Sequence, residues 1–358
     1  MPYKNVCFYF QVHQPYRLRE ISFFEDDPQD IFAGPPGYLN RDIFNKVADK
    51  CYLPMTRLVL HLAQTNPDFR AAYSLSGVFL EQCQDYPEKG AEILDLFKQL
   101  ADTGQVEFLA ETYYHSLSYL YAKEEFAEQI HQHMDTVKKL FGVKPTVFRN
   151  TELVYRNDVG EFIRQMGFKA MVCEGWDPYL HGSSPHYVRS AQPTELHAED
   201  VKVAAKYAIS KRPAKSLPLL LKSYQLSDDV AFRFSNKGWT DWPLTTEKYA
   251  EWLGIAEGET INLFMDYETF GEHQWEDTGI FHFMEKLPEV LKHHNIGFRT
   301  PSETIKHCEQ HGVYDVPHFL SWADMERDLS AWLENDLQHS ALEELARVEG
   351  MLHPHKHN

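Results

Sequence analysis

The chain has 358 residues, of which 43% are hydrophobic and 25% charged, so it is long and apolar enough to bury a sizeable core. Its formal net charge is -18, from 35 Lys and Arg residues against 53 Asp and Glu residues. Binding to nucleic acid requires a clustered basic surface, so this balance argues against that class of partner and favours a neutral ligand.

Short β-rich segments alternate with longer amphipathic segments, which is typical of a parallel sheet with crossover helices. The predicted strands, in chain order, are Val6 to Val12, Arg70 to Ser76, Val106 to Glu111, Thr146 to Arg149, Ala170 to Cys173, Val230 to Phe234, Ile261 to Met265 and Ile296 to Arg299. The predicted helices between them are Ile43 to Ala63, Pro87 to Ala101, Lys123 to Phe141 and Asp158 to Met166. Seven or eight strands suit a closed α/β barrel.

Two stretches depart from this alternation. Residues 176–227 are rich in Pro, Gly, His and Ser and are too long for an ordinary connection, so we predict an irregular excursion over the barrel mouth. After Pro317 apolar residues recur at helical spacing from Trp322 to Leu345. This pattern predicts a helical region that packs against the barrel.

The five cysteines lack C-x-x-C spacing, and we expect free buried thiols at Cys7, Cys51, Cys83, Cys173 and Cys308. No apolar run reaches the ~18 residues of a membrane-spanning helix, and the first residues lack a signal-peptide pattern. We therefore expect a protein of the reducing cytoplasm without membrane association.

Polar residues lie on or shortly after four of the predicted strands. His13 follows the first strand, Glu107 lies on the third, Glu152 follows the fourth and Asp266 follows a late one. Because the carboxyl ends of parallel strands meet on one face, we expect these side chains to share a rim. Glu268 shares a face with Asp266 if the strand continues, and crowding of like charges would keep one carboxyl group protonated.

Cleavage of a glycosidic bond needs one carboxyl group to attack or activate water and another to protonate the departing oxygen. Glu152 and Asp266 are placed for these roles, although a single strand-end carboxylate is more often a solvated cap. His13 alone is compatible with a metal ligand, a hydroxyl partner or a core histidine. We predict neither a metal nor a cofactor, because the sequence offers no convincing ligand spacing and no phosphate-binding loop.

Five short segments resemble, in order, the conserved regions of the α-amylase-like group of glycoside hydrolase family 57. They are His13-Gln14-Pro15, Gly104-Gln105-Val106-Glu107, Asn150-Thr151-Glu152-Leu153 with Tyr155, Met265 to His273, and Glu326 to Leu333. The third and fourth are the most specific. One departure is Glu334, which stands where the amylase-like members usually have glycine.

The resemblance implies a distorted (β/α)7 TIM-like barrel with a C-terminal α-helical region, and a retaining reaction through a covalent glycosyl-enzyme. The family's nucleophile falls on Glu152 and its general acid/base on Asp266. Its sugar-binding positions fall on His13, Glu107, Glu268, Asp328 and Trp332. We expect a catalytic barrel over residues 1–300 and a helical region over residues 301–358 that completes the active-site cleft.

The expected reaction is hydrolysis of α-1,4-glucosidic bonds in α-glucans such as starch, glycogen or maltooligosaccharides. Three alternatives stay open. They are a 4-α-glucanotransferase that uses the same site, a non-catalytic α-glucan-binding protein, and a metal-dependent polysaccharide deacetylase. The sequence does not predict an oligomeric state.

Overall fold

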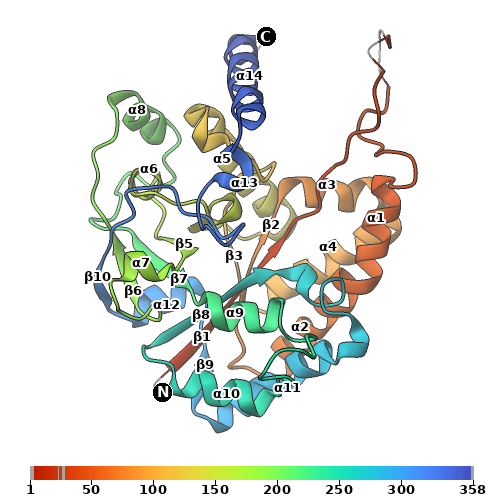
Figure 1. Cartoon of the computed structure of the whole chain (residues 1–358), viewed down its shortest axis with the longest axis vertical. Helices are drawn as coiled ribbons and strands as arrows, with labels where there is room; N and C mark the ends of the chain where they lie inside the picture. The colour runs from red at the N-terminus through yellow and green to blue at the C-terminus, as the bar shows by residue number, and fades with distance from the viewer. Residues whose placement is uncertain (1–3, 23, 26–28, 356–358) are drawn as a thin grey trace.

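The computed structural model describes residues 4–22, 24–25 and 29–355. Over these residues ten strands form one curled sheet that helices surround (Figure 1). The strands are β1 (Lys4–Val12), β2 (Ala71–Leu75), β3 (Val106–Phe108), β4 (Val147–Arg149), β5 (Ala170–Glu174), β6 (Val188–Ala191), β7 (Pro218–Lys222), β8 (Thr260–Asp266), β9 (Ile296–Phe298) and β10 (Gln310–Tyr314).

Seven of the strands form a parallel ring. In the ring β8 pairs with β1, β1 with β2, β2 with β3, β4 with β5, and β5 with β7. A bridge between Ala110 and Phe148 joins β3 to β4, and the register pair Lys222 and Asn262 joins β7 to β8. These thin junctions distort the barrel. The predicted α/β class and the seven-stranded barrel are therefore confirmed.

Three strands lie outside the ring. β6 runs antiparallel to β7, β10 pairs with β6, and β9 pairs with the first residues of β1. The barrel interior is filled by one cluster that draws on every ring strand or its extension, with Tyr9, Ala72, Leu109, Val147, Val172, Leu220 and Phe264 among its members. Phe8 and Phe10 point the other way, into the layer under the helices. Both faces of β1 are thus buried.

Helices form the outer layer, and four of the helical segments were predicted. The outer helices are α1 (Asn40–Val47), the π-helical turn η1 (Ala48–Tyr52), α2 (Leu53–Thr65), α3 (Gly77–Asp85), α4 (Pro87–Asp102), α5 (Lys123–Phe141), α6 (Asn157–Met166), α7 (Asp177–Leu180), α8 (Ala198–Lys206), α10 (Thr246–Ile255), α11 (Ile280–His293) and α12 (Pro301–His307). Gly142 and Gly167 end α5 and α6 with φ of 77° and 89°, left-handed values that glycine adopts readily. The helices predicted from Ile43, Pro87, Lys123 and Asp158 are confirmed.

One predicted strand is wrong. Residues 230–234 do not form a strand, because Val230 and Ala231 lie on the buried face of α9 (Tyr224–Ala231). The seventh ring strand is instead β7, which lies inside the segment predicted as irregular. Its Leu219-Leu220-Leu221 run is too short to show a period, so the pattern could not distinguish it from a loop.

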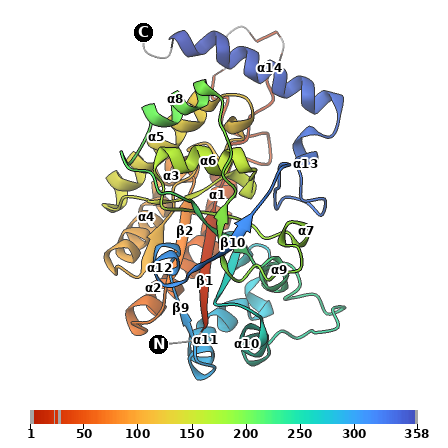
Figure 2. The same cartoon turned by 90° about the vertical axis from the view of Figure 1, so that its left-hand side faces the viewer.

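The C-terminal segment differs from its prediction as well. Its helices are α13 (Ser330–Leu333) and α14 (Asp336–Leu352), and α14 lies across the end of the molecule beyond α8 and α5 (Figure 2). None of its residues is buried, and Leu337 is 84% exposed, so α14 buries no apolar face against the barrel, although His353 at its end lies 3.3 Å from Glu124 of α5. The predicted apolar helical face began at Trp322, but residues 317–329 are not helical. The indole of Trp322 instead donates a hydrogen bond to Glu152.

All five cysteines are free and buried, as expected. Among the described residues no helix has the length and apolar character that crossing a lipid bilayer requires.

Candidate active site

A cleft of about 350 Å³ opens beyond the carboxyl ends of the ring strands. We call it the carboxylate cleft, because Glu152 and Asp266 both line it. The side chains beside them include Lys222, Asp228, Phe232, His273, Trp322, Met325 and Arg327. The structure therefore brings the two predicted catalytic residues, separated by 114 positions in the chain, to one concave surface.

Glu152 lies in the short 3-10 turn η3 (Thr151–Leu153) that follows β4. Its φ of 53° and the 51° of Leu153 are left-handed values that side chains rarely adopt. The carbonyl oxygen of Glu152 accepts hydrogen bonds from the backbone nitrogen of Trp322 at 3.1 Å and from the hydroxyl of Ser321 at 3.0 Å. These contacts hold an unfavourable turn that aims the carboxylate into the cleft.

Both oxygens of the Glu152 carboxylate have donors. Oε1 lies 2.9 Å from Nε2 of His115, and Oε2 accepts a hydrogen bond of 3.0 Å from the indole nitrogen of Trp322. Burial alone would raise the pKa of Glu152, but the bond to His115 and the positive charges of His115 and Arg149 outweigh it and lower the pKa to about 2. The carboxylate is therefore ionised at neutral pH.

His115 stands between two carboxylates. Its Nδ1 lies 3.1 Å from Oε2 of the buried Glu111, opposite its contact with Glu152. Burial lowers the pKa of His115, yet the hydrogen bonds with these two carboxylates raise it above its ordinary value. His13 stacks on the same ring with centroids 4.1 Å apart, and burial and the charge of His115 lower the pKa of His13 to about 3. One imidazole is thus biased towards the charged form and the other towards the neutral form.

A second layer supports His115. Glu111 accepts a hydrogen bond from Gln11 Nε2 at 3.3 Å and lies 3.9 Å from the guanidinium of the fully buried Arg149. Burial raises the pKa of Glu111, but His115 and Arg149 lower it to about 2. This buried negative charge fixes the orientation of His115 and favours its protonated form.

Asp266 occupies the opposite side of the cleft. It is the last residue of β8 and pairs in register with Gln11 of β1. Burial and the negative charge of Glu152 raise the pKa of Asp266. Behind it Glu268 accepts a hydrogen bond of 2.7 Å from the hydroxyl of Tyr52, and burial and Asp266 raise the pKa of Glu268 to about 8. This side of the cleft favours carboxyl groups that carry a proton.

The loop that carries Trp322 is fixed by ion pairs. Arg327 Nη1 lies 2.6 Å from Oε2 of the buried Glu174, and Arg327 Nη2 lies 3.9 Å from Oδ2 of Asp228, which also pairs with Lys222 Nζ at 3.1 Å. The indole ring of Trp322 has Lys222 Nζ at 5.1 Å and the guanidinium of Arg149 at 5.4 Å from its centroid. These contacts hold the indole that donates to Glu152.

None of the five residues predicted to bind sugar lines this cleft: His13 lines another cleft, and Glu268 lies behind Asp266. Glu107 lies on β3 below the rim, where its carboxylate accepts hydrogen bonds from the backbone nitrogen of Ser302 at 2.8 Å and from the Ser302 hydroxyl. Asp328 is exposed and accepts a hydrogen bond from the backbone of Ser330 at 2.7 Å. Trp332 is half-buried on α13 and is not among the lining residues.

His13 and His115 both line a second cleft, which has a volume of about 1050 Å³. Tyr16, Phe32 and Tyr114 line this cleft as well, and we call it the aromatic cleft. Phe32 and Tyr114 are 54% and 46% exposed, so flat apolar faces are open to a ligand there. The histidine pair lines the aromatic cleft, and His115 also reaches Glu152 of the carboxylate cleft through its hydrogen bond.

Sequence reasoning missed several members of the site, notably His115, Trp322 and Lys222. His115 stands four residues after Glu111, beyond a predicted strand, and a histidine in a strand-end loop is a usable signal. Trp322 matched an apolar helical period and was assigned to a helix face. Lys222 ends the strand that was not predicted. The described residues contain no group of three or more His, Cys, Asp and Glu side chains placed to hold a metal ion.

Comparison with known proteins places these features in a family. The model of the glycosyl hydrolase family 57 matches residues 7–317. A protein of Methanocaldococcus jannaschii named "Putative alpha-amylase" is 42% identical over 348 residues, which are 96% of this chain and 68% of that protein.

Two solved structures share the fold. The 4-alpha-glucanotransferase of Thermococcus litoralis has a TM-score of 0.63 at 18% identity, over 90% of this chain and 43% of that one. The GH57-type branching enzyme of Pyrococcus horikoshii has a TM-score of 0.65 at 12% identity, over 94% of this chain and 76% of that one. The chain thus spans less than half of the glucanotransferase.

Proposed function

Because this chain belongs to glycosyl hydrolase family 57, we propose that it cleaves α-1,4-glucosidic bonds of α-glucans with retention of configuration. Glu152 is the nucleophile in this proposal and Asp266 is the general acid and base. The observation that carries it is the contrast between the two groups in one cleft: the surroundings of Glu152 lower its pKa, and those of Asp266 raise its pKa. Retaining enzymes require this division between an ionised and a protonated carboxyl group.

The reaction then proceeds in two steps. A carboxylate oxygen of Glu152 attacks the anomeric carbon while Asp266 gives its proton to the departing glycosidic oxygen, which leaves a glucosyl ester on Glu152. Asp266, now ionised, takes a proton from an incoming water, whose oxygen attacks the same carbon and releases Glu152. His115 and Trp322 donate to the Glu152 carboxylate and hold it in place for both displacements.

The surroundings of the carboxyl pair suit a neutral sugar chain. Phe232 and Met325 line the carboxylate cleft and are 66% and 91% exposed, so they offer apolar contact on one side. The aromatic cleft, which the histidine pair lines, offers Phe32 and Tyr114. Lys222 and Asp228 supply hydrogen-bonding groups for hydroxyls near the reacting bond. A chain of several glucose units would contact both clefts.

Transfer is the second candidate, because the same glucosyl ester can be released by a sugar hydroxyl in place of water. It is favoured by the similarity to the 4-alpha-glucanotransferase of T. litoralis, which is 25% identical over 242 residues. Groups lining two adjoining clefts would hold an acceptor chain as readily as a leaving chain. Hydrolysis and transfer then differ only in whether water or the acceptor reaches the ester first.

One experiment separates these activities. The protein is incubated with maltoheptaose, and the products are resolved by chromatography with and without a strong chelator. Shorter products alone indicate hydrolysis, and products longer than seven units indicate transfer. Retention is read from the anomeric form of the first product by NMR. Retarded migration of the protein in a glucan gel without any products would indicate a binding protein, and chelator-sensitive release of acetate from acetylated glycans would indicate a deacetylase.

A further inference from the structure

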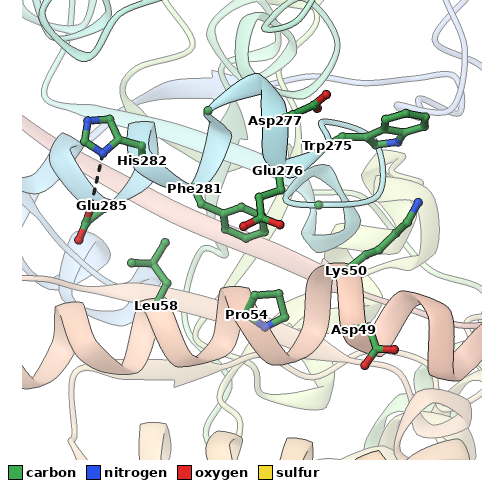
Figure 3. A pocket seen from close by; sticks show the side chains of 12 residues that line it. Asp49, Lys50, Pro54, Leu58, Trp275, Glu276, Asp277, Phe281, His282 and Glu285 are labelled. Carbon is green, nitrogen blue, oxygen red and sulfur yellow. Dashed lines mark ion pairs between the residues drawn. The ribbon is translucent and has the colours of Figure 1, made fainter.

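A third cleft lies on the outside of the barrel, between α2 and the segment that contains the turn η5 (Glu276–Thr278) and the start of α11 (Figure 3). Its volume is about 1050 Å³, and it shares no lining residue with the carboxylate cleft. Its characteristic side chains are Lys50, Pro54, Leu58, Trp275, Phe281 and His282. We call it the Trp275 cleft.

The cleft has an apolar floor and a fixed aromatic wall. Pro54, Leu58 and Phe281 are half-buried and form the floor (Figure 3). Trp275 is 60% exposed, yet its indole nitrogen donates to the carbonyl oxygen of Glu272 at 3.1 Å and Lys50 Nζ lies 5.1 Å from its ring centroid. An indole held in solvent by its own hydrogen bond is a preformed surface for stacking of a flat ligand face.

The rim of the cleft supplies hydrogen-bonding groups. Carboxylates line it at Asp49, Glu276 and Asp277, and the imidazole of His282 lies 3.5 Å from Glu285. Acceptors outnumber cations there, in a chain whose net charge is -18, so an anionic ligand would be repelled. A neutral ligand with many hydroxyls and an apolar ring face matches both the floor and the rim.

The cleft is joined to the carboxylate cleft by one short segment. Asp266 and His273 line the carboxylate cleft, whereas Gly271 and Trp275 line the Trp275 cleft. Gly271 has φ of 109°, and a Cβ atom built on it would lie 1.8 Å from the carbonyl oxygen of Lys50. The segment is therefore pressed against the π-helical turn η1, which carries Lys50.

We propose that the Trp275 cleft is a second binding site for α-glucan, which holds a distant part of the polymer while another part occupies the carboxylate cleft. This proposal rests on the proposed function, because it takes the substrate class from it. Because both sites bind the same glucan polymer, occupation of the Trp275 cleft raises the local concentration of substrate at the carboxylate cleft. The Trp275 cleft therefore increases the affinity for long glucans. A short maltooligosaccharide can occupy one site at a time and gains nothing from it.

The test compares polymer binding with turnover of a short substrate in Trp275→Ala. Affinity for amylopectin is measured by retardation in native gels that contain the polymer, and turnover is measured on maltotetraose. The variant should bind amylopectin at least about tenfold more weakly, because one aromatic anchor is removed. Its kcat/KM on maltotetraose should stay within about twofold of the parent, because this ligand does not need the second site. Trp275→Phe should restore most of the retardation.

Trp242→Ala is the matched control. Trp242 is also exposed, at 42%, and Lys237 Nζ lies 6.0 Å from its ring, but it lines none of the three clefts. This control should leave retardation unchanged. Equal retardation of Trp275→Ala and the parent, or an equal loss on polymer and maltotetraose, would overturn the second site while leaving the proposed function intact. A parent that is neither retarded nor active on any α-glucan would overturn the proposed function first.

Discussion

The two sides of the carboxylate cleft hold the same functional group in opposite surroundings. On the β4 side Glu152 faces His115, Arg149 and the indole nitrogen of Trp322, which favour its charged form. On the β8 side Asp266 faces Glu152 and lies next to Glu268 in a buried position, which favours its neutral form. The neighbours thus shift the pKa values of the two carboxyl groups in opposite directions, without any difference in the chemistry of the groups themselves.

The largest effect is expected from Glu152→Gln, which removes the ionised carboxylate from the β4 side of the cleft. Turnover of maltoheptaose should fall by several orders of magnitude, because the attack exists only on the way to the transition state. Binding of maltoheptaose, measured by calorimetry, should change little. Glu334→Gln, at an exposed position on the C-terminal segment, is the control. Near-parental turnover in a clean preparation would remove Glu152 from the mechanism.

Asp266→Asn removes the proposed general acid from the β8 side of the cleft. It should lower kcat/KM on maltoheptaose by about 10²- to 10⁴-fold, the usual contribution of a general acid. The loss in the first step should be smaller for an aryl α-maltoside, because a phenolate departs with less help from an acid. The initial burst of phenol measures that step. Equal losses on both substrates would indicate that Asp266 positions the sugar and does not protonate it.

His115→Gln tests the cause of the low pKa of Glu152. Glu152 must be ionised to attack, so activity is lost as pH falls through its pKa of about 2 in the parent. Without the charge of His115 this pKa should rise, and the acidic limb of the kcat/KM profile should move to higher pH. At neutral pH the loss should be about ten- to a hundredfold, as expected for one hydrogen bond to a charged group. An unshifted acidic limb would show that other groups set the charge of Glu152, and His339→Gln on exposed α14 serves as the control.

The smallest effect is expected from Glu107→Gln. Its carboxylate contacts Ser302 of α12, and Glu107 lines neither the carboxylate cleft nor the aromatic cleft. Its kcat/KM on maltoheptaose should stay within about twofold of the parent, since changes remote from a ligand seldom alter its transition state. A loss of more than about tenfold, with an unchanged unfolding midpoint, would show that Glu107 contacts the sugar.

The sequence predicted the barrel and the two carboxyl groups because both are encoded in short, local sequence patterns. Alternation of strands and helices reports the class, and a polar residue at the end of a buried strand reports the rim. β7 was missed because its three consecutive leucines show no period. Glu107 was placed at the rim of the barrel, whereas Glu111, four residues further along the chain, is the residue that contacts Gln11 there.

The supporting residues were beyond local reasoning for a different reason. Trp322 reaches Glu152 across 170 positions, through a loop whose irregular path is fixed by the pairing of Arg327 with Glu174. Its apolar neighbours follow a helical period by coincidence, and the segment is not helical. Long-range ion pairs of this kind leave no periodic mark in a sequence.

The close packing of Gly271 against Lys50 couples the position of the carboxylate cleft to that of the Trp275 cleft on the outer face of the barrel. Any side chain at this position must displace the carbonyl of Lys50, and the displacement would be felt by Asp266 on one side and Trp275 on the other. We therefore expect an alanine there to reduce both turnover of maltoheptaose and retardation by amylopectin.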